Sequence, residues 1–445
     1  MVPFFLRLFS YTAPVQATPL KVGLRMGAGL SSAADTMRAA EAACDQCLDA
    51  LGGSGSVDTA FLHFSAHHVD NAGDLASVVR RRLNVKNLVG VSTVAAIGGV
   101  SELEGAPGVS ILAGTMPGVT AKTFTFEDLP PLKSDEEVAS PETVAAISET
   151  IGAAPDLRMT LLLVDPFSVP LTRMLPAMNR ARSGKSPIFG GMASASNTPG
   201  GNAIILNDRV FRSGGVGISL RGSLHVDTVL SQGCRPFGPP MIVTKAKGNM
   251  IFELGGRNAI EVTQETVLEL GENYTQMLAG GLFIGRVIDE YKGRFGRNDF
   301  LIRNVVGVDQ ARGAIGVADR VRVGQTIRLH CRDAVTAHED LALLLDAQKL
   351  YDKPKGVLLV TCNGRGRRMF GATDTPSDHD ALAVARAFSQ TQGGEFLSKP
   401  GKPFEPQVEV PVPLAGFFAN GEIGPVGAES FVHGHTACLA LFRDP

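Results

Sequence analysis

The feature that most constrains the fold of this chain is a pattern of strands and a helix that occurs three times. In each occurrence an apolar strand leads to a helix, and a second apolar strand then ends in a glycine-rich turn followed by a further strand. The first strand and the helix are predicted, in chain order, at residues 59–64 and 72–83, 157–164 and 171–182, and 357–362 and 378–388. Because the spacing is irregular, the pattern predicts three related α/β units rather than a solenoid.

The number of predicted strands decides between two kinds of sheet. There are more strands than a regular strand–helix alternation needs, which favours mixed sheets over one parallel sheet. The fold class is therefore predicted as α/β with mixed, α+β-like sheets. A length of 445 residues fits two or three domains. We predict a disordered or targeting segment at 1–33, a first domain at 34–222 and a second domain at 223–445.

The composition excludes several classes of partner. There are 42 Lys and Arg residues against 44 Asp and Glu residues, so the chain lacks the basic balance typical of nucleic-acid binders. No apolar run approaches the roughly 18 residues that cross a bilayer. Trp is absent and Tyr occurs only 4 times, which argues against an aromatic platform for stacking bases or sugars. We expect neither a nucleic acid nor a membrane as partner.

Cysteine usage and the N-terminus bear on the cellular compartment. Six cysteines in a chain this long are not a disulfide framework, which favours a reducing, intracellular and cytoplasmic location. The first acidic residue is Asp35, and Arg7, Lys21 and Arg25 precede it among small and hydroxylated residues. This composition is typical of a plastid or mitochondrial targeting segment, and an ordinary disordered N-terminus explains it equally well.

No known cofactor or metal motif is complete in this chain. Ser183–Ser186 ends like a phosphate-binding loop, but Asn179 stands where its first glycine is required. Gly364–Gly366 is followed by Met369 where a dinucleotide-binding loop needs its third glycine. There is no nucleophile elbow, and there are no two Cys or His pairs at zinc-finger spacing. We therefore expect neither a cofactor nor a metal.

The first candidate site directly follows the apolar strand at 357–362. Cys362 and Asn363 end this strand, and Arg365 stands between two glycines. Ligands of α/β proteins usually bind at such strand ends, and the glycines let backbone amides approach a ligand. Arg365 can hold a carboxylate with two parallel hydrogen bonds. The alternative is a glycine-stabilised turn with a solvated arginine.

The second candidate site is the segment Asn420–Pro425 with His433–His435 downstream. Its Asn-Gly pair is a strong tight-turn signal, so the simple alternative is a hairpin without a functional role. If the strand ends converge, Glu422 and His433 supply an acid or base and a neutral partner.

A third feature is the glycine- and proline-rich segment 233–240. Its two glycines and three prolines predict a rigid loop that presents Cys234 and Arg235 at defined angles. Arg235 would help to stabilise a thiolate at Cys234. The alternative is a structural loop with an unreactive thiol.

Together these stretches resemble the FIST family, a sensory module with an N-terminal and a C-terminal FIST domain. The resemblance covers the chain from about Thr36 to Phe442, and it rests on Leu88–Thr93, Gly108–Ala113, Gly233–Pro239, Cys362–Gly366, Asn420–Pro425 and Phe431–Gly434. It implies that the two predicted domains are of FIST type and that the chain binds small ligands, with amino acids as candidates. Signal output is expected to need a separate protein partner, because no kinase, methyl-accepting, cyclase or F-box segment is visible.

The first functional hypothesis is therefore a soluble signal-transduction module that binds a small zwitterion such as an amino acid. Arg365 would hold the ligand's carboxylate, Glu422 would hold its ammonium group, and His433 would tune pH dependence or accept a hydrogen bond. The complete set of predicted ligand-binding residues is Cys362, Asn363, Arg365, Asn420, Glu422, His433 and Cys234.

Two hypotheses from other classes remain open at this point. One is a thiol-dependent enzyme that uses Cys362 or Cys234 as nucleophile and His433 as base. The other is a protein-interaction scaffold that docks through the segment around Phe237.

Overall fold

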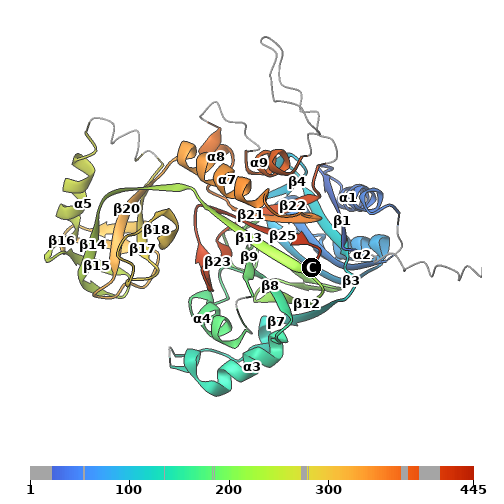
Figure 1. Ribbon diagram of the computed structural model, residues 1–445, viewed down its shortest axis with the longest axis horizontal. Coiled ribbons are helices and arrows are strands. Elements are labelled where there is room, and N and C mark those ends of the chain that lie inside the picture. Colours follow the sequence, from blue (N-terminus) through green and yellow to red (C-terminus); the bar gives the residue numbers. More distant parts are fainter. Residues whose placement is uncertain are drawn as a thin grey trace, which may run out of the picture.

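The computed structural model describes residues 23–53, 56–134, 136–182, 184, 186–271, 278, 280–371, 379–389 and 411–445. It contains three six-stranded sheets and one seven-stranded sheet. Helices cover the six-stranded sheets on three sides, and the seven-stranded sheet forms a separate body on the left of Figure 1. The mixed pairing of the strands confirms the predicted α/β fold class with mixed sheets.

The first two units of the repeated pattern follow one another along the chain. The first consists of β1 (Arg25–Ser31), α1 (Thr36–Ala50), β2 (Val57–Ser65), α2 (Ala72–Leu83), β3 (Val85–Thr93), β4 (Ala95–Gly98), β5 (Ser101–Glu104) and β6 (Val109–Thr115). The second consists of β7 (Val119–Thr125), α3 (Pro141–Ile151), β8 (Leu157–Val164), α4 (Leu171–Ala181), β9 (Ile188–Met192), β10 (Ile204–Leu206), β11 (Arg209–Phe211) and β12 (Gly215–Gly222).

The third unit has the same order but is interrupted by an insertion. It consists of β13 (His225–Gln232), α7 (Ala334–Gln348), β21 (Gly356–Cys362), α8 (Arg367–Phe370), α9 (His379–Phe388), β22 (Leu414–Ala419), β23 (Glu422–Val426), β24 (Glu429–His433) and β25 (Thr436–Arg443). The insertion follows β13 and contains β14 (Cys234–Lys247), β15 (Met250–Leu254), β16 (Arg257–Asn258), α5 (Ala259–Leu268), β17 (Leu282–Val287), β18 (Phe300–Asp309), β19 (Ala314–Val317) and β20 (Thr326–Arg332).

Each unit gives a hairpin to the sheet of another unit. The three sheets have the equivalent strand orders β1-β6-β2-β3-β10-β11, β7-β12-β8-β9-β23-β24 and β13-β25-β21-β22-β4-β5. In each sheet the third and fourth strands are parallel, and the last two strands are a hairpin from a different unit. The exchange is cyclic, so the three units form a closed ring with approximate threefold symmetry. Because of this exchange, strands from the predicted domain 34–222 lie in a sheet of the predicted domain 223–445, and the reverse is also true.

One glycine recurs at the same place in each sheet. Gly90, Gly190 and Gly416 lie opposite a leucine of the preceding parallel strand and opposite an isoleucine of the incoming hairpin. A methyl group at Gly190 or Gly416 would overlap the carbonyl oxygen of the opposing leucine, and one at Gly90 would lie 3.1 Å from it. This repeated contact confirms that the three predicted units are related.

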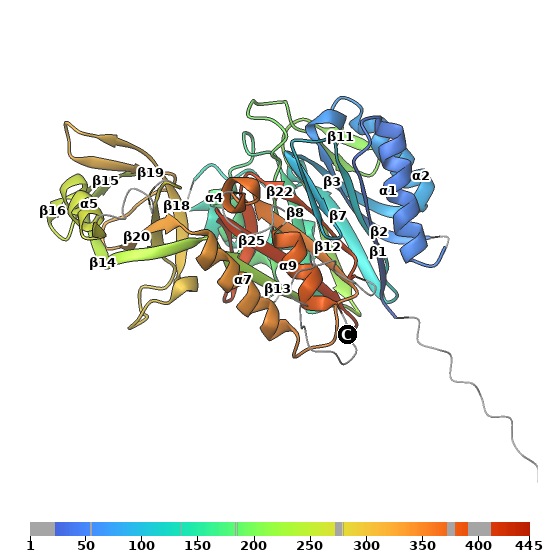
Figure 2. The same cartoon turned by 90° about the horizontal axis from the view of Figure 1, so that it is seen from above.

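The four largest core clusters around the three six-stranded sheets are one central cluster and three outer ones. The central cluster contains side chains from all three six-stranded sheets, including Phe61, Phe189 and Phe417. The outer clusters lie between each sheet and its own helices, α1 with α2, α3 with α4, and α7 with α9. Figure 1 shows these helix pairs on different sides of the ring, and Figure 2 shows α7 and α9 side by side over the third sheet. The sheets thus form the walls of a three-sided prism.

The insertion folds into a small barrel with its own core. Strand β14 pairs with β20 on one side and with β15 on the other, which closes the seven-stranded sheet. The prediction of a loop at 233–240 was wrong, because β14 begins at Cys234 and runs through this segment. Within this segment its pairing with β20 is irregular between Phe237 and Met241, where glycine and two prolines interrupt the ladder. Phe237 is buried in the barrel core, so it offers no docking surface to a partner.

The predicted N-terminal segment 1–33 is in part an ordered strand. Residues 1–22 lie outside the described residues, whereas Arg25–Ser31 form β1 and pair with β6. The segment contains Gly27 and Gly29, which are unfavourable in isolated strands. Here they let α1 approach, since a methyl group at either position would overlap a carbonyl oxygen of that helix.

Candidate functional site

A polar cavity of about 390 Å³ lies where the barrel meets the prism. One wall comes from the ends of β21, β22 and β24, a second from β18 and the residues after β19, and a third from the start of α4. Its lining residues are Pro166, Val169, Pro170, Leu171, Thr172, Met192, Ile302, Arg303, Asn304, Ala318, Asp319, Cys362, Asn363, Asn420, Gly421, Val432, His433, Gly434 and His435. The size falls within the range of small-molecule sites.

The prism wall brings together the two motifs that the sequence singles out. Cys362 ends β21 directly beside Ala419 of the parallel strand β22, and the Asn363 amide lies 3.4 Å from the side-chain oxygen of Asn420. The Asn-Gly pair is not a hairpin turn as the simple alternative has it. It is the crossing point between two sheets, because β22 belongs to the third sheet and β23 to the second.

The barrel wall contributes a pair of opposite charges that the sequence analysis missed. The Arg303 guanidinium donates to the Asp319 carboxylate at 2.8 Å, and Arg286 approaches the same carboxylate at 3.4 Å. Arg303 also donates to the backbone carbonyl of Val432, which ties β18 to β24 of the prism. No local pattern marks Arg303 or Asp319, since only the barrel fold brings them to this cavity.

His435 of the prism contacts two side chains of the barrel at the cavity. Its Nε2 lies 2.9 Å from the Asn304 side-chain oxygen and its Nδ1 3.4 Å from an Arg332 nitrogen. The arginine can only donate, so Nδ1 accepts and Nε2 carries the proton. Burial, followed by the positive charge of Arg332 and neighbouring arginines, lowers the pKa of His435 to about 3. Its backbone has a left-handed φ of 63°, a strained conformation that often marks functional sites.

His433 lies beside Glu422 but has a partner of its own. The two residues are directly opposite each other on β24 and β23, as the sequence hypothesis requires. The His433 ring donates from Nε2 to the carbonyl of Gly424 at 2.9 Å. Burial lowers the pKa of His433 to about 4, so the ring is neutral at physiological pH and offers no titration there.

Glu422 lies behind the cavity and is fully buried. One carboxyl oxygen accepts from the backbone and hydroxyl of Thr436, at 3.1 and 2.7 Å. The other oxygen has no hydrogen-bond partner among the described residues. Burial raises the pKa of Glu422 to about 8, although the Thr436 hydrogen bonds oppose the shift. The side chain is therefore mainly protonated and neutral at pH 7.

The Glu422→Gln substitution should remove a pH dependence of stability. Between the ordinary glutamate pKa of about 4.3 and the folded value of about 8, only the folded state holds this proton. The free energy of unfolding must therefore fall as pH rises through this window. We expect the stability of the unsubstituted protein relative to Glu422→Gln to fall by about 1.5 kcal/mol between pH 6.5 and 8.

Urea unfolding of both proteins at several pH values measures this difference. Histidine titration in the unfolded state affects both proteins equally and cancels. Glu429→Gln, at an exposed position of β24, is the matched control. A difference between Glu422→Gln and the unsubstituted protein that stays constant over this pH window would show that Glu422 is ionised in the fold.

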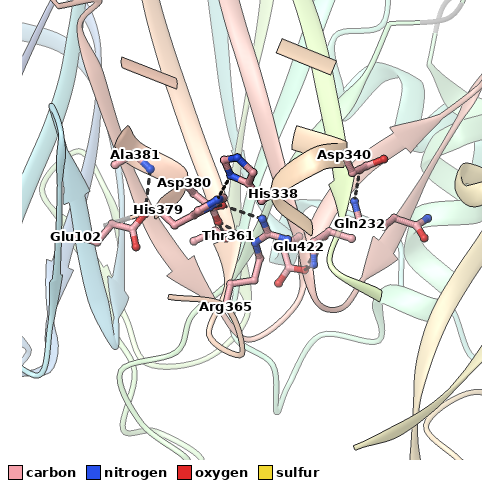
Figure 3. Close-up of polar contacts among 11 residues, drawn as sticks. Glu102, Gln232, His338, Asp340, Thr361, Arg365, His379, Asp380, Ala381 and Glu422 are labelled. Carbon is pink, nitrogen blue, oxygen red and sulfur yellow. Dashed lines mark hydrogen bonds and ion pairs between the residues drawn. The ribbon is translucent and has the colours of Figure 1, made fainter. Parts of the chain in front are cut away.

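Arg365 is also buried behind the cavity rather than exposed to it. Its Nε and Nη2 donate to the two carboxylate oxygens of Asp380 at 2.8 and 2.7 Å, and the Thr361 hydroxyl donates to the same carboxylate. Figure 3 shows this pair with His379 and His338 continuing the row of contacts. Nε and Nη2 are therefore already bound within the protein, and the fully buried side chain does not reach the cavity as a ligand clamp would.

The thiols are placed for packing rather than for nucleophilic attack. Burial, with the nearby Glu422 adding to it, raises the pKa of Cys362 to about 12. Burial also raises the pKa of Cys234 well above its usual range, and Arg235 instead pairs with Asp333 at 3.2 Å. A thiolate is the reactive species, so neither cysteine has the environment of a catalytic nucleophile. Among the described residues, no group of three or more metal-ligating side chains is present.

The fold and the site define an α/β protein with a ligand-sized polar cavity between a threefold prism and an inserted barrel. The chain belongs to the FIST family. The FIST N domain matches residues 58–257 and the FIST C domain residues 259–396, so the two meet at β16. FIST domains are a sensory family of signal transduction, which places the chain in that class.

Mycobacterial relatives match nearly the whole chain. An uncharacterized protein of Mycobacterium tuberculosis, MT0656, is 37% identical over 95% of this chain and 100% of its own length. An uncharacterized protein of Mycobacterium bovis, Mb0898c, is 35% identical over 95% of this chain and 99% of its own. These bacterial relatives give no support to organelle targeting by residues 1–33. In the part of the chain that the structure describes, no helix combines the length and apolar character that a membrane span requires.

Proposed function

We propose that this FIST protein senses a small zwitterion, such as an amino acid, in the cavity between barrel and prism. The observation that carries the proposal is the pair Arg303 and Asp319, which offers a cation and an anion side by side in the cavity wall. A ligand with a carboxylate and an ammonium group complements both charges. Side-chain amides and ring nitrogens of the prism wall supply further hydrogen bonds.

The residues predicted from the sequence divide into two groups in this proposal. Cys362, Asn363, Asn420 and His433 line the cavity and would contact the ligand. Arg365, Glu422 and Cys234 are fully buried and would act by positioning the lining segments.

Signal output would follow from the position of the cavity. A ligand held by β18 on one side and by the ends of β21 and β22 on the other bridges the barrel and the prism. Binding would favour one placement of the barrel, because a ligand stabilises the state to which it binds better. A separate protein partner would then recognise that placement.

The Arg303→Gln substitution tests the proposal. Charged hydrogen bonds contribute roughly 1.5–3 kcal/mol each, so we expect ligand affinity to fall at least about tenfold. Native mass spectrometry of the purified protein, compared with its denatured mass, looks for a co-purified ligand. Calorimetric titration with the twenty amino acids then measures affinity for the unsubstituted protein and the variant.

Two comparisons make this test specific. Arg312→Gln is the matched control, because Arg312 lies on the same barrel, is 66% exposed and pairs with Asp309 away from the cavity. Analogues that lack either the amine or the carboxylate should bind more weakly than the parent amino acid. Unchanged affinity in Arg303→Gln, or no binding by any zwitterion of the panel, would refute the proposal.

A further inference from the structure

The barrel contains a second cavity whose chemistry differs from that of the polar one. It measures about 430 Å³ and lies between α5 and the strands β17, β18 and β19. Its lining residues are Ile260, Thr263, Gln264, Val267, Leu268, Leu282, Val305, Val308, Gln310 and Ile315. Seven of these ten are aliphatic and none is charged, whereas Arg303 and Asp319 line the polar cavity.

Aliphatic side chains at the cavity are left in contact with water. Leu268 is 66% exposed and Val308 is 55% exposed, while Ile260 and Ile315 are buried deeper in the barrel. The cavity is therefore an apolar hollow that continues the barrel core to the surface. Covering such surface is favourable, because it removes apolar area from water.

One polar group in this apolar wall lacks a partner. Thr263 is 7% exposed, and its hydroxyl has no hydrogen-bond partner among the described residues. Thr266, three residues later on the same helix, donates to the backbone carbonyl of Val262 at 2.8 Å. Thr263 does not form the corresponding bond to the preceding helical turn, and a buried hydroxyl without a partner is unfavourable.

We propose that this cavity binds an uncharged small molecule with an aliphatic or aromatic body and one hydrogen-bond acceptor. The body would cover the aliphatic wall, and the acceptor would accept a hydrogen bond from the Thr263 hydroxyl. A volume of about 430 Å³ falls within the range of small-molecule sites. The site is distinct from the polar cavity and does not depend on the function proposed for it.

Fluorescence titration of the full chain with N-phenyl-1-naphthylamine, an uncharged aromatic probe, tests the proposal. The chain has no tryptophan, so protein fluorescence contributes little background. We expect saturable binding at one site and displacement by 2-undecanone, which has an aliphatic chain and one carbonyl. Val308→Asp places a charge at the cavity and should weaken probe binding at least tenfold. Val323→Asp is the control, because Val323 is 62% exposed and does not line the cavity.

Two further variants separate loss of the site from loss of the fold. Leu268→Glu repeats the test of Val308→Asp at a separate exposed position, in case one variant fails to fold. Thr263→Val should weaken 2-undecanone about threefold to tenfold through the lost hydrogen bond. Thr263→Val should change the binding of N-phenyl-1-naphthylamine much less, because this probe has no carbonyl acceptor.

Three outcomes would overturn the proposal. The first is the absence of saturable binding, and the second is binding that persists in both charged variants. The third is a dimer of the unsubstituted chain that Val308→Asp converts to a monomer. That result would make this face a contact between two copies of the chain.

Discussion

Replacing Asp380 by Ala should lower the free energy of unfolding by about 3–5 kcal/mol, because it leaves the Arg365 guanidinium buried without its counter-charge. Both side chains are almost completely removed from solvent, with exposures of 0% and 1%. Although burial opposes ionisation, the charge and hydrogen bonds of Arg365, together with His379, hold the pKa of Asp380 far below its usual range. Urea unfolding of the full chain measures the loss.

The same pair also shapes the polar cavity. Arg365 stands in the segment that continues from Cys362, and its backbone amide donates to the Cys362 carbonyl at 2.9 Å. A variant that disturbs the guanidinium should therefore disturb Cys362 and Asn363 at the cavity wall. A binding assay on Asp380→Ala would show this only if the variant is still folded.

Two controls identify burial as the cause of the expected loss. Asp45→Ala breaks the pair with Arg82, whose members are 48% and 47% exposed, and should cost far less than Asp380→Ala because water screens an exposed pair. The double variant with Arg365→Met and Asp380→Leu removes both charges and should recover most of the stability lost in Asp380→Ala. If Asp380→Ala lowered the free energy of unfolding no more than Asp45→Ala, another group or water would have to compensate the charge of Arg365.

The sequence predicted the units well because their signals are local. The helix predicted at 72–83 is α2, and the start of α3 at Pro141 follows from the capping Ser140, whose side chain accepts from the Thr143 amide. The apolar strand before Cys362 was equally clear, since an unbroken apolar run predicts a strand buried on both faces.

The exchange of hairpins between units could not be predicted in the same way. Whether the hairpin after β22 pairs within its own sheet or with β9 depends on how three units pack around a common core. The residues from Asn420 to Gly424 contain no local signal that predicts which sheet the hairpin joins. The Asn-Gly pair therefore looked like an ordinary turn, whereas it lies at the crossing from one sheet to another.

The residues of the candidate site likewise divide into those with a local sequence signal and those without one. Cys362 and Asn420 were found because they end strands that the pattern itself defines, and the parallel pairing of β21 and β22 brings them together. Arg303 and Asp319 were missed because they belong to the insertion, which has no counterpart in the first two units. Arg365 stood out between its glycines, but its partner Asp380 lies 15 residues further along the chain, where no spacing rule connects them.

Replacing Gly416 by Ala should lower the free energy of unfolding by at least about 3 kcal/mol, the upper range for overpacking a core. The added methyl group would overlap the carbonyl oxygen of Leu359, which belongs to the neighbouring strand and cannot rotate away as a side chain can. Gly190→Ala should have a similar effect against the carbonyl of Leu162. Urea unfolding of the variants measures both losses.

The threefold relation makes the remaining variants informative. Gly90 is the equivalent position in the first sheet, but its nearest neighbour would be the Leu62 oxygen at 3.1 Å, so Gly90→Ala should cost only about 1 kcal/mol. Gly73 lies on α2 with nothing within 4 Å, and Gly73→Ala should raise stability by about 0.5–1 kcal/mol. Equal losses at Gly90 and Gly416 would mean that the first and third sheets are packed alike here and that the closer contact at Gly416 has no energetic consequence. A larger loss at Gly416 than at Gly90 would instead show that β21 and β22 pack more tightly than β2 and β3, the equivalent parallel pair of the first sheet. The ends of β21 and β22 form part of the polar cavity.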